Sequence, residues 1–263
     1  MDRAQQGVQS VEVAGRLLRV LVDHGQSMML RDLANAAGMA AAKVHRYLVS
    51  LQRLGLVAQD PRSGRYDLAN FALELGLARQ ARVDVIAAAT EELERLRDAT
   101  QETVQLAVWG EKGATVVRVL EAHGMNFFVT RVGAVMPLTS SATGLVFAAF
   151  LPHTMTNGLI AQDLEENRRS SAGRGPKTKK DLDAVLGQII KHGLARVQGT
   201  VTRGINALSA PIFDHESKLV AAITVLGPER RLDVAWEEAA AAAVSKAASN
   251  VSLALGYLGS RQN

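Results

Sequence analysis

Four residues in the first quarter of the chain have the types and the spacing needed to bind a polyanion. Lys43, Arg46, Ser50 and Arg53 follow one another at intervals of three, four and three residues, so on a helix they share one side. Lysine and arginine attract phosphates whatever the base sequence, and Arg46 could hold a guanine edge through two hydrogen bonds. Solvated helices can carry the same charges, so the surrounding elements must decide between these interpretations.

The charge of the chain is concentrated around this segment. The formal net charge is +4 over 263 residues, and residues 31–66 hold six basic side chains against only Asp32 and Asp60. This stretch therefore accounts for the whole excess, which favours a nucleic-acid partner at this place. A second basic run, between Arg168 and Lys180, lies in a Gly- and Ser-rich stretch without apolar periodicity. We expect that run to be a solvated loop.

Three short apolar patterns are expected to position the basic helix. They cover residues 13–21, 30–37 and 44–54, and the glycines that end them are Gly25, Gly38 and Gly55. The tight turn between the second and third has the spacing of a helix-turn-helix, whose second helix enters the major groove. Two short strands at 56–58 and 65–68, joined by a turn with Pro61 and Gly64, predict a β-hairpin wing.

The rest of the chain alternates strands and helices. A helix at 71–80 is followed by an amphipathic helix from Val83 to Leu96, and the periodicity then changes to that of strands. We predict strands at 104–108, 114–119, 127–129, 205–213 and 219–226, and helices at 141–150, 180–192 and 233–257. Mostly antiparallel strands with helices on one or both faces predict an α+β domain.

The segment from Val132 to Ser141 is the expected wall of a ligand site, because it leads directly into a predicted helix. Hydroxyl groups and free backbone N–H groups at a helix start can bind a carboxylate. Alternatively, Ser140 or Ser141 only caps the helix, which is the commoner role of such residues.

The chain resembles regulators of the IclR type. In the first domain the resemblance rests on VQSVEVAGRLLRVL, LRDLANAAGM, KVHRYLVSLQRLGLV and DPRSGRYDL; in the second it rests on ETVQLAVW, RVGAVMPLTSSATG, INALSAPIFD and AAITVLGP. It implies a winged helix-turn-helix at 1–70, a linker helix at 71–81, and a GAF/PAS-like domain at 82–263 for effector binding and oligomerisation. It further implies that the chain binds a palindromic operator in double-stranded DNA, binds a small-molecule effector, and assembles as a homodimer or tetramer.

Five positions depart from the pattern of this family. Ala42 and Lys43 stand where a Ser-Thr pair is common, so the operator contacts are expected to differ. Thr139, Val197 and Ala207 stand where many members have a histidine, an acidic residue and a cysteine. The predicted pocket is therefore more apolar, which favours an aromatic acid, a lactone or a longer organic acid as effector.

From the residues and the resemblance together, we predict two sets of binding residues. The DNA-binding set is Arg31, Ala42, Lys43, His45, Arg46, Arg53, Arg62 and Arg65. The effector-binding set is Val132, Gly133, Ala134, Met136, Leu138, Thr139, Ser140, Ser141, Val197, Ile205, Asn206, Ala207, Thr224 and Leu226. For His45, packing against the turn as a surface histidine is an equally good interpretation.

Other classes of function find little support. The chain has no cysteine, no G-x-S-x-G, no G-x-x-x-x-G-K-[ST] and no G-x-G-x-x-G, and its six histidines are scattered. We therefore expect neither an enzyme, a metal site nor a cofactor. No apolar run reaches the ~18 residues of a membrane span, so we expect a soluble, cytoplasmic protein with no membrane partner. The main alternative is a DNA-binding architectural factor that a protein partner controls.

Overall fold

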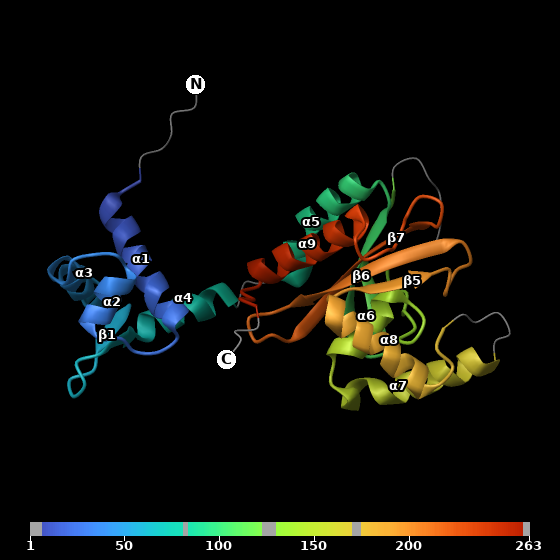
Figure 1. Ribbon diagram of the computed structural model, residues 1–263, viewed down its shortest axis with the longest axis horizontal. Coiled ribbons are helices and arrows are strands. Elements are labelled where there is room, and N and C mark those ends of the chain that lie inside the picture. Colours follow the sequence, from blue (N-terminus) through green and yellow to red (C-terminus); the bar gives the residue numbers. More distant parts are fainter. Residues whose placement is uncertain (1–6, 81–83, 123–129, 170–174, 260–263) are drawn as a thin grey trace, which may run out of the picture. The chain divides into compact units, whose positions relative to one another are not determined.

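The computed structural model describes residues 7–80, 84–122, 130–169 and 175–259 (Figure 1). The chain forms two compact units, which meet in sequence between Arg82 and Val83. The N-terminal unit consists of α1 (Gln9–His24), α2 (Leu30–Ala36), α3 (Ala41–Arg53), β1 (Val57–Gln59), β2 (Tyr66–Leu68) and α4 (Asn70–Gln80).

The core of the N-terminal unit is formed by the apolar sides of its first three helices. Val13, Leu17 and Leu21 are the buried residues of α1, and their spacing of four places them on one side. Gly25 ends this helix in the left-handed conformation (φ 71°), where its N–H donates to the carbonyl of Leu21. The helices at 13–21, 30–37 and 44–54 that the sequence predicts are all present.

The predicted wing is an antiparallel hairpin of β1 and β2, in which Val57 pairs with Leu68 and Gln59 with Tyr66. Met28 adds a bridge to Tyr66, with N···O distances of 2.9 and 2.8 Å, so the hairpin is fixed to the α1–α2 connection. Asp60 organises the tip, because its carboxylate accepts hydrogen bonds from the backbone N–H groups of Arg62 and Ser63. These bonds lower the pKa of Asp60.

The helix α4 is held to the hairpin at its first turn and is otherwise uncovered within its unit. The N–H of Phe71 donates to the carbonyl of Gly55 at 3.1 Å. Further along, Leu73 is 62% exposed and Leu77 is 52% exposed. An apolar surface of this kind on a helix is a usual place for contact with another chain or domain.

The C-terminal unit is a five-stranded antiparallel sheet covered by helices on both faces. Its elements are α5 (Val85–Thr100), β3 (Thr103–Gly110), β4 (Gly113–Leu120), α6 (Ala142–Phe150), α7 (His153–Arg169), α8 (Lys179–His192), β5 (Ala195–Gln198), β6 (Ile205–Phe213), β7 (Leu219–Pro228) and α9 (Ala239–Ala254). The strand order is β4-β3-β7-β6-β5. In Figure 1, α5 and α9 lie on one face and α6 and α8 on the other.

Alternation along the strands divides the sheet residues between these two layers. Leu208, Ala210 and Ile212 of β6 join the core beneath α5 and α9, whereas Ala207 and Phe213 pack on the α6 side. The same rule assigns each polar strand residue to one face. It therefore decides which of them can reach a site under α6.

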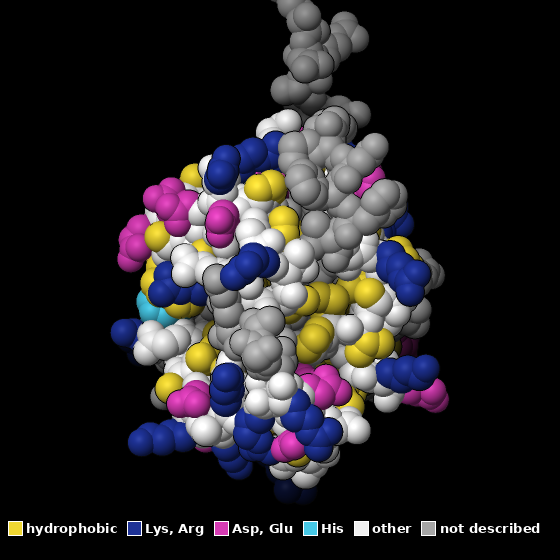
Figure 2. All heavy atoms as spheres, turned by 90° about the vertical axis from the view of Figure 1, so that its right-hand side faces the viewer, with side chains coloured by type: hydrophobic (Ala, Val, Ile, Leu, Met, Phe, Trp, Pro, Cys, Tyr) yellow, Lys and Arg dark blue, Asp and Glu magenta, His cyan; other side chains and the backbone are white. Residues whose placement is uncertain are grey.

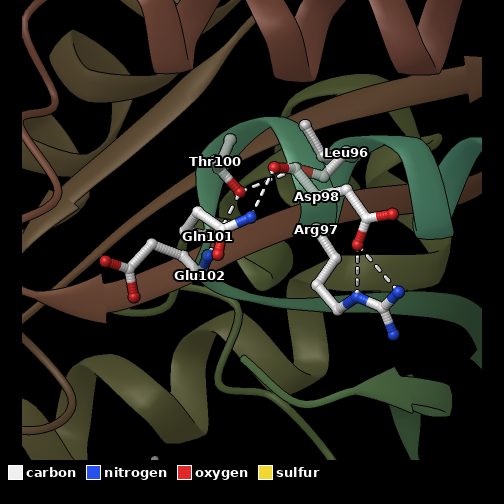
Figure 3. A network of polar contacts seen from close by, with 6 residues as sticks. All are labelled: Leu96, Arg97, Asp98, Thr100, Gln101 and Glu102. Atoms are coloured by element: carbon white, nitrogen blue, oxygen red, sulfur yellow. Dashed lines mark hydrogen bonds and ion pairs between the residues drawn. The ribbon is translucent and has the colours of Figure 1, made fainter. Parts of the chain in front are cut away.

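A turn with one residue of positive φ connects α5 to β3 (Figure 3). Gln101 adopts φ 56°, its N–H donates to the carbonyl of Arg97, and its Nε2 donates to the carbonyl of Asp98, both at 2.7 Å. The next residue, Glu102, is only 4% exposed and forms an ion pair with Arg231 at 2.7 Å. This ion pair joins the start of β3 to the segment after β7.

Two expectations need correction, and two elements were not expected. The sequence patterns predicted neither α7 nor β5. The predicted helix at 233–257 begins only at Ala239, because Leu232 and Val234 are buried in a non-helical segment. The basic run is not all loop: Arg168 and Arg169 end α7 and pair with Glu165, and Lys179 begins α8. The strand predicted at 127–129 lies outside the described residues.

The two tryptophans of the chain both contact aromatic partners in the C-terminal unit. Trp236 stacks on His192 with ring centroids 4.1 Å apart, and the guanidinium of Arg196 lies 4.4 Å from the Trp236 ring. Trp109 of β3 contacts Phe147 of α6, with centroids 5.8 Å apart. One tryptophan is therefore at the β5 edge of the sheet and the other is under α6.

Candidate functional site

The exposed side of α3 carries the basic residues that the sequence placed there. Lys43, Arg46 and Arg53 are exposed, whereas Val44 and Leu48 on the opposite side are fully buried. A shallow hollow along the helix is lined by Lys43, Arg46, Tyr47 and Ser50. The hydroxyl of Ser50 bonds back to the carbonyl of Arg46 at 3.4 Å. This side of α3 can therefore present cations to a phosphate backbone.

The other predicted DNA-binding residues lie around this helix in different states. Ala42 and His45 are exposed on α3, Arg31 is exposed in the first turn of α2, and Arg62 is exposed on the hairpin. Arg65 differs, because it is half-buried and its Nε donates to the carbonyl of Ser27 at 3.2 Å. Arg65 thus fastens the hairpin to the α1–α2 connection.

A cavity lies between α6 and the sheet in the C-terminal unit. It encloses about 430 Å³ of empty space, part of it open to solvent. Its lining is Gln105, Thr130, Met136, Ser141, Ala142, Thr143, Val197, Val201, Thr202, Ile205, Ala207, Thr224 and Leu226. None of these side chains is charged. Figure 2, a view of one end of this unit, shows hydrophobic side chains gathered in a hollow among charged ones.

The floor of the cavity is a row of polar side chains across three strands. Gln105 of β3 is opposite Thr224 of β7, which is opposite Ser209 of β6. Nε2 of Gln105 donates to the hydroxyl of Thr143 at 2.9 Å, that hydroxyl is 2.8 Å from the hydroxyl of Thr224, and Thr224 donates to Ser209 at 2.9 Å. All four residues are buried. The row therefore forms one hydrogen-bonded relay that includes α6.

Two polar atoms of the lining have no hydrogen-bond partner among the described residues. They are Oε1 of Gln105 and Oγ1 of Thr130. Gln105 is 1% exposed, so its amide oxygen is withdrawn from bulk water. Buried acceptors in proteins are normally hydrogen-bonded, and an unpaired one indicates a missing water or ligand.

The first turn of α6 supplies the polar end of the cavity. Ser141 caps the helix: its hydroxyl accepts from the N–H of Gly144 at 2.9 Å and donates to the carbonyl of Pro137 at 2.7 Å. Within the described part of the chain, the N–H groups of Ala142 and Thr143 have no acceptor. Two free donors at the positive end of a helix can hold a carboxylate.

Family models match both units. The model of the IclR helix-turn-helix domain matches residues 10–61, and the model of the C-terminal domain of bacterial IclR transcriptional regulators matches residues 78–253. The chain belongs to the IclR family. Its fold, an α+β protein with an N-terminal helix-turn-helix, is that of this family, which consists of transcription regulators rather than enzymes.

Known relatives agree with this assignment. The IclR-family chain is 32% identical to the glycerol operon regulatory protein of Streptomyces griseus over 86% of its own length and 87% of the relative's. It is 37% identical to Pseudomonas aeruginosa HmgR, whose crystal structure matches with a TM-score of 0.87 over 96% of this chain and 100% of that one. An IclR homologue from Microbacterium hydrocarbonoxydans, solved in complex with 4-hydroxybenzoate, matches at 18% identity and a TM-score of 0.55, covering 94% and 99%.

The structure brings together half of the effector residues predicted for this IclR-family chain. The predicted residues that line the cavity are Met136, Ser141, Val197, Ile205, Ala207, Thr224 and Leu226. Asn206 lies on the opposite face of the sheet, because it alternates with Ile205 and Ala207 along β6; its Nδ2 donates to the carbonyl of Leu232. Leu138 packs in the core, and Thr139 is buried against α7.

The remaining predicted residues have positions outside the cavity. Val132, Gly133 and Ala134 run beside the edge strand β4, where the N–H of Val116 donates to the carbonyl of Ala134 at 2.8 Å. Ser140 borders Gly175. Gln105 and Thr143 line the cavity although the sequence of this family member did not predict them there. Alternation with Val104 and Leu106 was a signal that Gln105 occupies one defined face.

Side chains of α7 hold the wall segment of the IclR-family chain in place. Asp163 accepts hydrogen bonds from the N–H groups of Leu138 at 2.5 Å and Thr139 at 3.2 Å. Nδ2 of Asn167 donates to the hydroxyl of Thr139 and to the carbonyl of Pro176, both at 3.0 Å. Burial raises the pKa of Asp163 more than these bonds lower it. The missed helix α7 thus positions the segment that leads into α6.

Two further kinds of feature bear on function, a metal-binding cluster and a membrane-spanning helix. The described residues of this family member include no group of three or more His, Asp or Glu side chains that could bind a metal ion. No helix among them combines the length and the apolar character needed to cross a bilayer.

Proposed function

We propose that this IclR-family regulator binds a palindromic operator as a homodimer or tetramer, and that a small organic acid in the cavity under α6 changes its affinity for that operator. The observation that carries the proposal is the pair of N–H groups without an acceptor at the start of α6, on residues that line a cavity whose described side chains are uncharged. We favour a repressor that controls the genes for the catabolism of such an acid.

The α3 side supports the DNA part of the proposal. Its exposed cations can neutralise phosphates, and the first two turns, with Ala42 and Arg46, are the part that reaches base edges when such a helix enters the major groove. Two copies of α3 are needed to read a palindrome. The exposed leucines of α4, Leu73 and Leu77, are candidates for the contact between two chains.

The lining supports an acid with an apolar body. The described lining includes no cationic side chain, so a carboxylate would depend on the N–H groups of Ala142 and Thr143. Val197, Ile205 and Leu226 would contact the rest of the molecule. An aromatic acid, a lactone or a longer organic acid suits this lining, and the relative solved with 4-hydroxybenzoate makes that acid a suitable first probe.

Control of DNA binding would follow from linkage. A ligand that binds one arrangement of the two chains more tightly shifts the population toward it, and so changes the spacing of the recognition helices. The competing function is that of a DNA-binding factor controlled by a protein partner. In that case the cavity would stay unliganded and operator affinity would not respond to small acids.

Fluorescence anisotropy with the intergenic DNA beside the gene would test the proposal. We expect at least one of 4-hydroxybenzoate, benzoate, hexanoate or 6-hydroxyhexanoate to change the operator Kd, and its uncharged amide to have little effect. A clear preference for two- and three-carbon acids would contradict the apolar cavity as the effector site. No response to any acid would favour the partner-controlled factor.

A further inference from the structure

The amide of Gln105 imposes a chemical requirement on whatever fills the cavity. Its Nε2 is already used, because it donates to the hydroxyl of Thr143 at 2.9 Å. The direction of the relay is consistent along its length: Thr143 can pass its own proton to Thr224 at 2.8 Å, and Thr224 donates to Ser209 at 2.9 Å. With the amide in this orientation, Oε1 is the atom left without a partner among the described residues.

An amide oxygen carries no hydrogen and can only accept. A ligand atom beside it must therefore donate, as a hydroxyl or an N–H group does. A carboxylate, carbonyl or ether oxygen at the same place would meet a second acceptor and would leave both atoms desolvated and unpaired. A single ligand would then place its carboxylate at the start of α6 and its hydrogen-bond donor beside Oε1 of Gln105.

The proposed function does not specify which substituents the organic acid carries. The following inference rests on that function and specifies one of these substituents. We infer that Gln105 is the specificity-determining residue of the cavity and selects an organic acid that also carries an uncharged hydroxyl or N–H donor. The unpartnered hydroxyl of Thr130 in the same lining can take part in a second hydrogen bond with such a ligand, as donor or acceptor.

Matched pairs of acids test this inference by titration calorimetry on the full chain. The pairs are 4-hydroxybenzoate with benzoate, 3-hydroxybenzoate with benzoate, and 6-hydroxyhexanoate with hexanoate. In at least one pair the hydroxy acid should bind about tenfold to a hundredfold more tightly, the usual effect of leaving a buried acceptor unpaired. In Gln105→Met, which has a similar volume and no acceptor oxygen, this preference should fall to near unity.

Gln198→Met is the matched control, because Gln198 is exposed at the β5 edge and does not line the cavity. It should keep the hydroxy-acid preference of the wild type. If the hydroxy and unsubstituted acids bind equally, or if Gln105→Met keeps the preference, the inference is wrong while the organic-acid function stands.

If no acid of the panel binds, the proposed ligand class fails, and a ligand-free measurement decides the role of Gln105. An unpaired buried oxygen is costly, but Gln105→Met also removes the hydrogen bond from Nε2 to Thr143. The comparison is therefore made in a Thr143→Val background, where Nε2 has already lost that acceptor, and there unliganded Gln105→Met should unfold at a midpoint equal to or above that of Thr143→Val alone. A midpoint several degrees lower would mean that Oε1 already has a partner in the unliganded protein. That result would overturn the inference.

Discussion

A methyl group on the Cα of Gly144 would lie 1.9 Å from the carbonyl oxygen of Pro137. The same carbonyl accepts hydrogen bonds from the hydroxyl and the N–H of Ser141. The first turn of α6 therefore packs against the backbone of the wall segment at a distance that only glycine permits.

Gly144→Ala should destabilise the C-terminal unit, because the carbonyl of Pro137 belongs to the backbone and cannot move aside cheaply. We expect a loss of about 2–3 kcal/mol in the free energy of unfolding, as for other overpacked sites. Urea unfolding followed by circular dichroism measures it. Gly158→Ala is the control: Gly158 lies on α7 with nothing near its Cβ position, so alanine should stabilise by up to ~1 kcal/mol. Equal effects of the two changes would contradict the close packing.

Asp163→Asn should alter the pH dependence of stability. Burial raises the pKa of Asp163 above 3.8, so the folded protein holds this proton more strongly than the unfolded chain does. The free energy of unfolding of the wild type therefore falls as the pH rises from 3.8 through the raised pKa. Asparagine keeps an acceptor for the N–H groups of Leu138 and Thr139 without the charge.

Relative to the wild type, Asp163→Asn should consequently be more favourable at pH 7 than at pH 4. Calorimetric melting at the two pH values measures the difference. Asp183 is exposed on α8, and Asp183→Asn is the control: its effect on the melting temperature should be the same at both pH values. If Asp163→Asn has its larger benefit in acid, the assigned direction of the pKa shift is wrong.

Arg231→Ala should leave the buried carboxylate of Glu102 without its ion pair. Because Arg231 is itself 41% exposed, water can partly replace it, and we expect a loss of about 1–3 kcal/mol rather than the full cost at a dry site. The double change Glu102→Gln with Arg231→Ala should recover part of this loss, which chemical denaturation can measure. Arg230→Ala, an exposed neighbour, serves as control. An additive double mutant would argue against the ion pair.

Arg46→Ala should weaken operator binding and change how it depends on salt. Removing a base contact costs about 1–3 kcal/mol of affinity, whereas losing a phosphate contact such as that expected of Lys43 reduces the salt slope by about one. Anisotropy titrations at several salt concentrations separate the two effects. Arg95→Ala on α5 of the C-terminal unit is the control and should change neither quantity. Unchanged binding in Arg46→Ala would remove α3 as the reading helix.

The N-terminal unit could be predicted well because its apolar positions repeat at helical spacing and a glycine follows each helix. The C-terminal unit was harder. In α7 the buried residues Thr156, Ile160 and Leu164 have helical spacing, but Thr156 is polar, which leaves only two apolar positions, and Asn157-Gly158 resembles a turn. In β5 only four residues pair, at the edge of the sheet. Neither segment has a periodic signal long enough to stand out.

For the cavity, too, some residues could be assigned from local sequence patterns and others only from the tertiary structure. Asn206 could have been excluded from the sequence alone, because alternation along β6 already assigns Ile205 and Ala207 to one face. Alternation also assigns Gln105 to one face, but it does not show that this face is buried, since a glutamine in a strand normally indicates a solvated face. Gln105 is buried because α6 covers that face of the sheet. No pattern in the residues around Gln105 predicts that a helix packs there.

The placement of the two tryptophans has a practical consequence. Since Trp109 contacts Phe147 of α6 and Trp236 stacks on His192, all indole emission of the chain originates in the C-terminal unit. The N-terminal unit contributes only tyrosine signal, from Tyr47 and Tyr66. The fluorescence of the two units can therefore be recorded separately. In one sample, indole emission can report ligand binding in the cavity while the anisotropy of labelled DNA reports operator binding.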